Sequence, residues 1–131
     1  MTVVFREVEV FRPYPNEFPD HLLWDAGADE TCVEQWQAAE MVRIVKYCGE
    51  IVALYAMDRD DTTIFCLHGL VVAASWRKQR LGRWVIGHAI GVAESKGARH
   101  IVVPATGASR CFARIGFNAE GRGWRYDLIP E

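Results

Sequence analysis

The sequence lacks several features that would assign it to a specialised class of protein. No apolar run approaches the roughly 18–20 residues that a membrane-spanning helix needs, because charged side chains interrupt every stretch. The segment Met1 to Arg12 contains Arg6, Glu7 and Glu9, so we do not expect it to act as a signal peptide. No internal repeat or low-complexity segment is visible. We therefore expect a cytoplasmic protein with no membrane partner, and a single domain over residues 1–131.

Cysteine is scarce, and its spacing does not suit a metal site. The four cysteines form no CxxC pair, and the nearest two, Cys32 and Cys48, are sixteen residues apart, whereas structural zinc sites use closely spaced pairs. A chain of 131 residues that is 50% apolar can bury a substantial core without disulfides. We expect no metal, and reduced cysteines that act as small core residues.

Net charge is small, but its distribution along the chain is uneven. The chain has 15 Lys+Arg against 17 Asp+Glu, a formal net charge of −2. Residues 1–61 contain 13 acidic and 5 basic side chains, a net of −8, and residues 62–131 contain 4 acidic and 10 basic ones, a net of +6. The basic residues are not interleaved with aromatic ones in a recognisable module, so nucleic acid is not the expected partner. The uneven distribution favours an anionic ligand for the second half.

Alternation of apolar and polar residues predicts a meander of strands in the first half. Two short helices, at His21 to Trp24 and Val33 to Met41, are expected after the first strand. The strands themselves are expected at Thr2 to Phe11, Val42 to Cys48, Ile51 to Met57 and Ile64 to Ala74. The last three must be antiparallel, because their connections are too short for crossovers.

The second half predicts longer connections between its strands. A helix is expected over Leu81 to Lys96, with Gly97 as its C-terminal stop. A strand at Arg99 to Val103 would complete a β-α-β unit, and a second helix and one or two final strands would follow at Ala108 to Ile115 and Phe117 to Ile129. The predicted fold is an α/β (α+β) domain, with a mixed sheet of six or seven strands. An antiparallel meander precedes the β-α-β unit, and helices cover both faces.

The loop between the strand Ile64 to Ala74 and the following helix has the strongest chemical signal. Four of the seven residues from Arg77 to Arg83 are cationic. The first amides of a helix lack intrahelical partners and carry partial positive charge, so they bind phosphate oxygens, and Gly82 allows an anion to approach the main chain closely. A solvated basic loop is the plainer interpretation of a charge run. The strand before the loop and the helix after it favour a phosphate site, although neither a Walker nor a dinucleotide motif is present.

Three motifs in this half resemble those of the Gcn5-related N-acetyltransferase (GNAT) family. The family pattern R/Q-x-x-G-x-G/A appears as Arg77-Lys-Gln-Arg-Leu-Gly82, after a strand with Leu67, Leu70 and Val72 in an L-x-x-L-x-V pattern. An aromatic residue before an Ile-Gly-Phe turn appears in Cys111 to Phe117. The resemblance covers about Val42 to Ile129, and the segment from Thr106 is similar to a subset that includes N-acetylglutamate synthases and arsenic-resistance acetyltransferases.

The resemblance implies acyl transfer from acetyl-CoA to an amine. The main chain of Gln79 to Arg83 would hold the pyrophosphate, and Leu70 to Val72 would pair with the pantetheine arm like an added strand. The cofactor-binding residues implied in this way are Leu70, Val71, Val72, Arg77, Lys78, Gln79, Arg80, Leu81, Gly82, Arg83 and Phe112.

Two residues depart from the family pattern. Arg80 stands where the first motif glycine is usual, and Phe112 stands where many members have a tyrosine that protonates the leaving thiolate. Phe112 has no hydroxyl and cannot be a general acid. A thiol with a pKa near ~8.5 is nevertheless a tolerable leaving group near neutral pH.

His68 is the candidate catalytic base, because it is the only ionisable residue in the run Ile64 to Ala74 apart from Cys66. By strand alternation it should share a face with Cys66, Leu70 and Val72, and burial would favour its neutral form. A core histidine bonded to a neighbouring carbonyl is an equally good interpretation.

Other side chains have weaker claims to a role. Core packing is favoured over nucleophilic catalysis for Cys111, and a lid over the helix is favoured over adenine contact for Trp76. Tyr126 could replace the missing hydroxyl. Trp24 and Trp36 would border the acceptor site.

The sequence thus predicts an N-acetyltransferase that uses acetyl-CoA and a small-molecule or amino-acid-like amine, with a cationic amine compatible with the acidic first half. The alternative is a non-catalytic sensor of CoA or acetyl-CoA that acts through a protein partner, since fold alone does not establish activity. A homodimer is compatible with either hypothesis.

Overall fold

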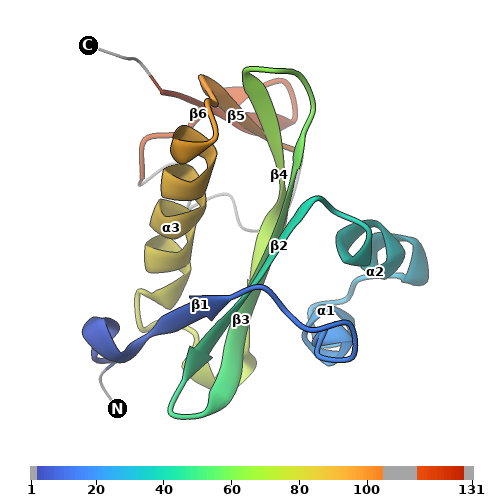
Figure 1. Cartoon of the computed structure of the whole chain (residues 1–131), viewed down its shortest axis with the longest axis vertical. Helices are drawn as coiled ribbons and strands as arrows, with labels where there is room; N and C mark the ends of the chain where they lie inside the picture. Colours follow the sequence, from blue (N-terminus) through green and yellow to red (C-terminus); the bar gives the residue numbers. More distant parts are fainter. Residues whose placement is uncertain (1–2, 105–114, 129–131) are drawn as a thin grey trace.

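The computed structural model describes residues 3–104 and 115–128 (Figure 1). The predicted helix Ala108 to Ile115 therefore lies almost entirely outside the described residues. The strands are β1 (Glu9–Phe11), β2 (Met41–Tyr47), β3 (Glu50–Arg59), β4 (Ile64–Val72), β5 (His100–Val103), β6 (Asn118–Glu120) and β7 (Gly123–Asp127). The helical elements are the helices α1 (Asp20–Asp25), α2 (Glu30–Gln37) and α3 (Leu81–Ser95) and two 3-10 turns, Phe5–Glu7 before β1 and Ala74–Trp76 between β4 and α3.

All seven strands form one mixed sheet in the order β1-β2-β3-β4-β5-β7-β6. β1 to β4 are antiparallel neighbours, as the short connections require. β4 and β5 are parallel and are joined through α3, and β7 pairs antiparallel with both β5 and β6. The predicted fold class is confirmed. The first strand is shorter than predicted, because Phe5–Glu7 turns into a 3-10 helix and only Glu9–Phe11 pairs with β2.

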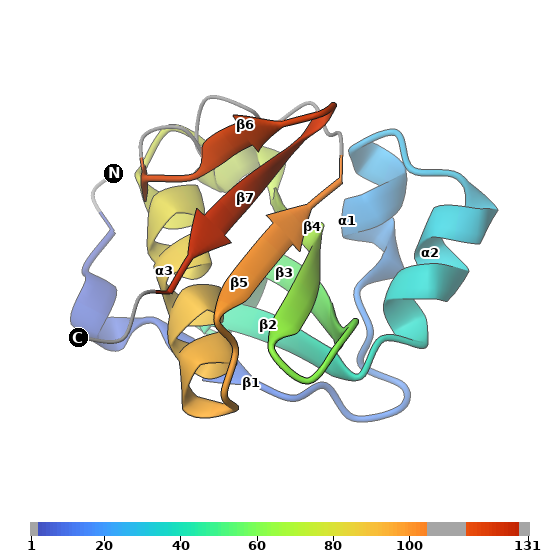
Figure 2. The same ribbon diagram turned by 90° about the horizontal axis from the view of Figure 1, so that it is seen from above.

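The sheet lies between α3 on one face and α1 with α2 on the other (Figure 2). Phe65 and Leu67 of β4 pack with Leu81 and Val85 of α3 in the larger core cluster. The smaller cluster joins buried residues of α1, α2, β2 and β3: Leu22, Leu23, Val33, Trp36, Ile44, Leu54 and Ala56. Each face of the central strands is therefore covered, which explains why the sequence of β3 is apolar almost throughout.

The cysteines depart from the expected core role at one position. Cys32 and Cys66 are half-buried, whereas Cys48 is exposed, and all three are free thiols. Cys48 and Gly49 form the two-residue turn between β2 and β3, with φ values of 53° and 75°. A hairpin turn of this kind needs positive φ at both positions, so Cys48 is held at the surface by the turn.

The described residues contain neither a membrane-spanning helix nor a cluster of metal ligands. None of their helices is long and apolar enough to cross a membrane. Over the same residues, no group of three or more His, Cys, Asp or Glu side chains is placed to hold a metal ion.

Candidate active site

β4 and β5 are paired only where they begin. Their register runs from Ile64 opposite His100 to Cys66 opposite Val102, but β4 continues to Val72 while β5 ends at Val103. Past Cys66, no strand of residues 3–104 or 115–128 pairs with the β5-facing edge of β4. Main-chain N–H and C=O groups on such an edge can bind an extended ligand as an added strand.

A β-bulge in β4 places His68 beside this opening. In the register of β3 and β4, Met57 lies opposite Leu67 and Ala56 lies opposite Gly69. His68 is therefore an extra residue with no partner across the ladder, which bends the strand and redirects its side chains. Gly69 follows with a φ of 148°, and the Trp36 indole lies so close that an added Cβ would be 3.2 Å from it.

The bulge overturns one prediction about side-chain orientation. Leu70 and Val72 pack with the larger core cluster on the α3 side, as Leu67 does. His68 and Cys66 line a cavity bordered by residues of α1 and α2, and neither belongs to that cluster, whereas Leu70 both packs with the cluster and contributes to the cavity lining. Strict alternation across β4 is broken by the extra residue, so His68 shares a face with Cys66 but not with Leu70 or Val72.

His68 forms a hydrogen-bonded pair with Asp58, a residue that the sequence analysis did not single out. The His68 Nε2 atom lies 2.7 Å from Asp58 Oδ2, and the side chains are 11% and 38% exposed. The Glu40 main-chain N–H donates to Asp58 Oδ1 at 2.8 Å. Burial raises the pKa of Asp58, but the hydrogen bonds from His68 and Glu40 outweigh it and lower that pKa below its usual value. The carboxylate is therefore ionised at neutral pH.

This pair fixes the proton arrangement of the neutral imidazole. An ionised carboxylate can only accept, so Nε2–H donates to Asp58 and Nδ1 keeps its lone pair. Nδ1 has no hydrogen-bond partner among the described residues. His68 thus presents a proton-accepting atom from a strand whose bulge aims the side chain at the cavity.

The cavity beside His68 has a volume of about 800 Å³, a size suited to a small-molecule ligand. Its lining includes Leu23, Trp36, Val71 and Pro104 as well as Cys66, Gly69 and Leu70. Trp36, predicted to border an acceptor site, does line it. Trp24 is 46% exposed on α1 and is not among the lining residues.

The two cysteines in the cavity are poor candidates for a covalent nucleophile. Burial raises the pKa of the Cys66 thiol, and the carboxylates of Asp60 and Asp58 raise it further. Burial also raises the pKa of Cys32, with a contribution from Asp29. Both thiols are therefore protonated near neutral pH, and the thiolate is the nucleophilic form.

The basic loop has an unusual main-chain conformation. Lys78 and Arg80 both adopt left-handed conformations, with φ values of 65° and 64°. Arg80 is the residue that stands where the family pattern has a glycine, and its φ shows why glycine is usual there. Left-handed residues interspersed in a chain turn their amides toward one side, which creates an anion-binding concavity.

The start of α3 continues this concavity. Arg80 is its N-cap, no side chain caps the first amides, and no acidic residue lies in the first turn. Leu81 buries its side chain in the core, while Gly82 is only partly buried. Arg77, at the start of the loop, ties it to the end of β4, because its Nε donates to the Val72 carbonyl at 3.1 Å. The amides at the start of α3 thus lack protein partners in the described chain, as a phosphate cradle requires.

Replacing Arg80 with glycine is expected to stabilise the protein by about 1 kcal/mol, because glycine adopts a left-handed conformation without steric cost. Urea unfolding monitored by circular dichroism measures the change. The matched control is Arg83→Gly, which places glycine inside the first turn of α3 and should destabilise by about 1 kcal/mol. Equal losses of stability in the two variants would contradict the proposed strain at Arg80.

The remaining predicted residues fall into three groups. Trp76 is a core residue, 5% exposed, with its ring in edge contact with Tyr47, and it belongs to the same core cluster as the buried face of α3. Tyr126 packs with the α3-side cluster and contacts Phe117, whereas His68 faces the cavity on the other side of the sheet. Phe112 and Cys111 lie outside the described residues.

The structure thus combines a mixed sheet that opens between two parallel strands with a basic loop and an uncapped helix start, which is the arrangement that the resemblance to acetyltransferases implies. The model of the acetyltransferase (GNAT) family matches residues 7–117, and the chain belongs to this family. A search of curated protein sequences finds no significant match.

Solved structures of two acetyltransferases and of an N-acetylglutamate synthase have the same fold at low sequence identity. A GNAT family acetyltransferase from Elizabethkingia anophelis with acetyl-CoA bound superposes with a TM-score of 0.79 at 18% identity, covering 88% of this chain and 78% of that one. A Bacillus subtilis acetyltransferase in complex with CoA gives 0.76 at 17% identity, with coverages of 94% and 99%. N-acetylglutamate synthase from Neisseria gonorrhoeae, complexed with CoA and N-acetyl-glutamate, gives 0.70 at 16% identity, with coverages of 90% and 34%.

Proposed function

We propose that this protein is an N-acetyltransferase that transfers the acetyl group of acetyl-CoA to the amine of a small molecule. The observation that carries the proposal is that three features belong to β4 or to the loop and helix that follow it. These are the uncapped start of α3, the unpaired strand edge past Cys66 and the proton-accepting His68 beside an 800 Å³ cavity. A CoA thioester has three parts in the corresponding order: the pyrophosphate, the extended pantetheine arm and the reacting thioester.

The fit of CoA to these residues follows from their chemistry. The left-handed turns at Lys78 and Arg80 and the free amides of Leu81 to Arg83 suit the pyrophosphate. The main chain of Leu70 to Val72 lies on the unpaired edge and would pair with the pantetheine arm. Acetyl-CoA, when bound there, supplies an activated acetyl thioester.

His68 would then remove a proton from the acceptor. The amine reaches the active site mainly as an ammonium ion and must lose a proton before its nitrogen can attack. In our proposal Nδ1 of His68 takes that proton, directly or through one water molecule. Asp58 is a positioning residue, because its hydrogen bond holds the Nε2–H tautomer and stabilises the imidazolium that forms.

The acceptor would occupy the cavity between β4 and the helices α1 and α2. Its walls combine apolar groups such as Leu23 and Trp36 with the half-buried Cys66 and His68. The carboxylates of Asp58 and Asp60 act electrostatically on Cys66, which lines the cavity. Their negative charge lowers the free energy of bringing an ammonium ion into the cavity. A cationic amine is therefore the proposed acceptor class. A homodimer and a cytoplasmic location remain proposals from the sequence.

The second candidate function, a CoA-sensing regulator, rests on Phe112 in place of the usual tyrosine. The His68–Asp58 pair favours the enzyme, because a sensor needs no proton acceptor at the cavity.

The test is acetyl-CoA turnover by the purified chain across a panel of primary amines, with free-thiol release as the readout. We expect thiol release that depends on at least one amine and produces an acetylated amine detectable by mass spectrometry. CoA binding by calorimetry without release for any amine would contradict the enzyme and favour the sensor.

A further inference from the structure

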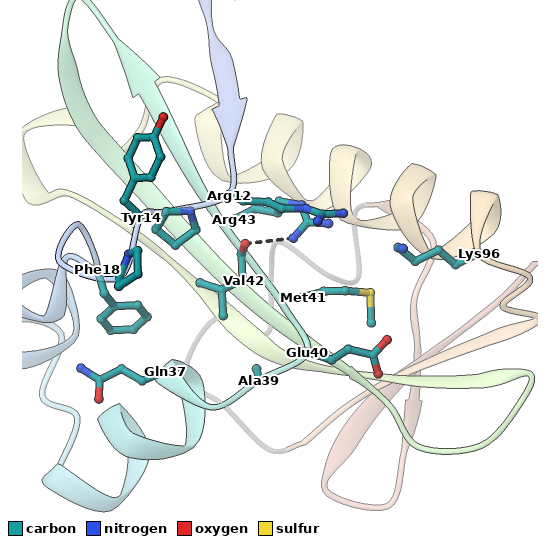
Figure 3. Close-up of a pocket in the computed structure, with 12 residues that line it drawn as sticks. Arg12, Tyr14, Phe18, Gln37, Ala39, Glu40, Met41, Val42, Arg43 and Lys96 are labelled. Carbon is teal, nitrogen blue, oxygen red and sulfur yellow. Dashed lines mark hydrogen bonds between the residues drawn. The ribbon is translucent and has the colours of Figure 1, made fainter.

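A second cavity lies at the outer edge of β2, away from the one beside His68. β1 pairs with β2 only from Ile44 to Lys46, so Met41 to Arg43 form an uncovered strand edge. The segment of residues 12–18 and the end of α2 border this edge and enclose a cavity of about 650 Å³ (Figure 3). It shares no lining residue with the cavity beside His68.

Three cations from three different elements converge on this cavity. Arg12 follows β1, Arg43 belongs to β2, and Lys96 follows the last turn of α3. Figure 3 shows the guanidinium groups of Arg12 and Arg43 directed toward the Lys96 side chain. None of the three forms an ion pair within the described part of the chain. The one acidic lining residue there is Glu40.

Arg43 is the most informative of the three. It is partly buried, and its one side-chain hydrogen bond within the described residues runs from Nη1 to the neighbouring Val42 carbonyl at 3.0 Å. Burial lowers the pKa of Arg43, Tyr55 acts in the opposite direction, and the charge of Arg12 lowers it further. Burial likewise lowers the pKa of His88, with a contribution from Arg43. A partly buried guanidinium beside a second one is costly unless an anion compensates the charge.

The rest of the lining describes the body of the ligand. Phe18, Met41 and Val42 provide apolar surface, and Tyr14, which is 74% exposed, stands at the rim. A cavity of this volume accommodates a small molecule rather than a single inorganic ion. A guanidinium pair recognises carboxylate and phosphate oxygens through charge-assisted hydrogen bonds.

We infer that this cavity is a binding site for a small organic anion, whose carboxylate or phosphate lies between Arg12, Arg43 and Lys96 and whose apolar part lies against Phe18 and Val42. The inference does not depend on the proposed acetyltransferase activity. The site is nevertheless connected to the active site, because Glu40 lines this cavity and its main-chain N–H holds the Asp58 carboxylate that pairs with His68.

Titration of the isotope-labelled full chain, followed by amide NMR, tests the inference. The probes are phenyl phosphate, inorganic phosphate and the neutral benzyl alcohol. We expect saturable shifts at Met41 to Arg43 and Lys96 with phenyl phosphate, at least fivefold weaker binding of inorganic phosphate, and no saturable shift with benzyl alcohol. Phosphate bound at the start of α3 is distinguished because it shifts Leu81 to Arg83 instead.

Arg43→Gln and Arg12→Gln should each raise the Kd for phenyl phosphate at this cavity by at least tenfold, because each removes one guanidinium. The control Arg6→Gln neutralises an exposed arginine outside the cavity and should leave the Kd unchanged. Arg12 is exposed, so its variant tests the inference even if Arg43→Gln fails to fold. Absence of saturable shifts at these amides, or an unchanged Kd in Arg12→Gln, would overturn it.

Discussion

Turnover of the preferred amine is expected to fall by about one hundredfold or more in His68→Ala, with the affinity for CoA unchanged. The imidazole is the one proton acceptor that the structure places at the cavity with a free ring nitrogen among the described residues. It is not part of the loop and helix start that would bind the phosphates. The loss should therefore appear in kcat, and calorimetric titration with CoA should match the unsubstituted protein.

The chain offers a closely matched control for this substitution. His100 also pairs with an aspartate, because its Nδ1 lies 2.7 Å from Asp127 Oδ1, but neither residue lines the cavity beside His68. His100→Ala should retain full turnover. Asp58→Asn should cause a smaller loss than His68→Ala and change the pH profile of kcat, as expected for a residue that acts through the imidazole. Unchanged turnover in His68→Ala would remove His68 from the mechanism.

Gly82→Glu is expected to raise the Kd for CoA by about one hundredfold. The new carboxylate would lie in the first turn of α3, where the free amides attract anions, and would compete with the pyrophosphate and repel it. Like charges about 4 Å apart near a protein surface cost several kcal/mol, and each 1.4 kcal/mol changes the Kd by about tenfold. Calorimetric titration with CoA measures the effect.

Gly87→Glu provides the comparison on the same helix. Gly87 is exposed, and an added Cβ there would have no neighbour within 4 Å. Both substitutions replace glycine in a helix and should raise the free energy of unfolding by up to about 1 kcal/mol. Only Gly82→Glu should weaken CoA binding. Equal affinities in the two variants would show that the pyrophosphate binds elsewhere.

The meander and the β-α-β unit of the sheet were predictable because they depend on local patterns. The short turns from Val42 to Ala74 require antiparallel neighbours, and the helix from Leu81 has a clear apolar face and a glycine stop. The point at which β4 and β5 separate could not be predicted from the sequence. The pairing ends at Cys66 while the apolar pattern continues to Val72, and a residue pattern does not show where the hydrogen bonds between two strands end.

The bulge at His68 explains the main error about the site. Alternation in steps of two assigns Cys66, His68, Leu70 and Val72 to one face, and one extra residue in the ladder divides that set. The same register brings Asp58 opposite Cys66 and within reach of His68. A cross-strand partner of this kind could have been sought near the hairpin at residues 59–63, where acidic residues gather, but its identity depends on the register.

The cavity at the outer edge of β2 could not be predicted from the charge of the sequence. Arg12 and Arg43 both belong to the half of the chain with a net charge of −8, so summed charge predicts the opposite of what that edge presents. The two arginines meet because β1 ends at Phe11, opposite Ile44, and leaves the next pair of positions uncovered. The positive charge at this edge therefore depends on the length of β1, which the composition of the sequence does not determine.

The separation of β4 from β5 also bears on how long a molecule of this protein survives in a cell. A ligand that fills the gap binds only the folded chain, and at one hundred times its Kd it adds about 2.7 kcal/mol to the free energy of unfolding. Proteases that capture transiently opened chains act in proportion to the open population. If CoA thioesters fill the gap as proposed, the amount of the enzyme would rise and fall with the supply of its own acetyl donor.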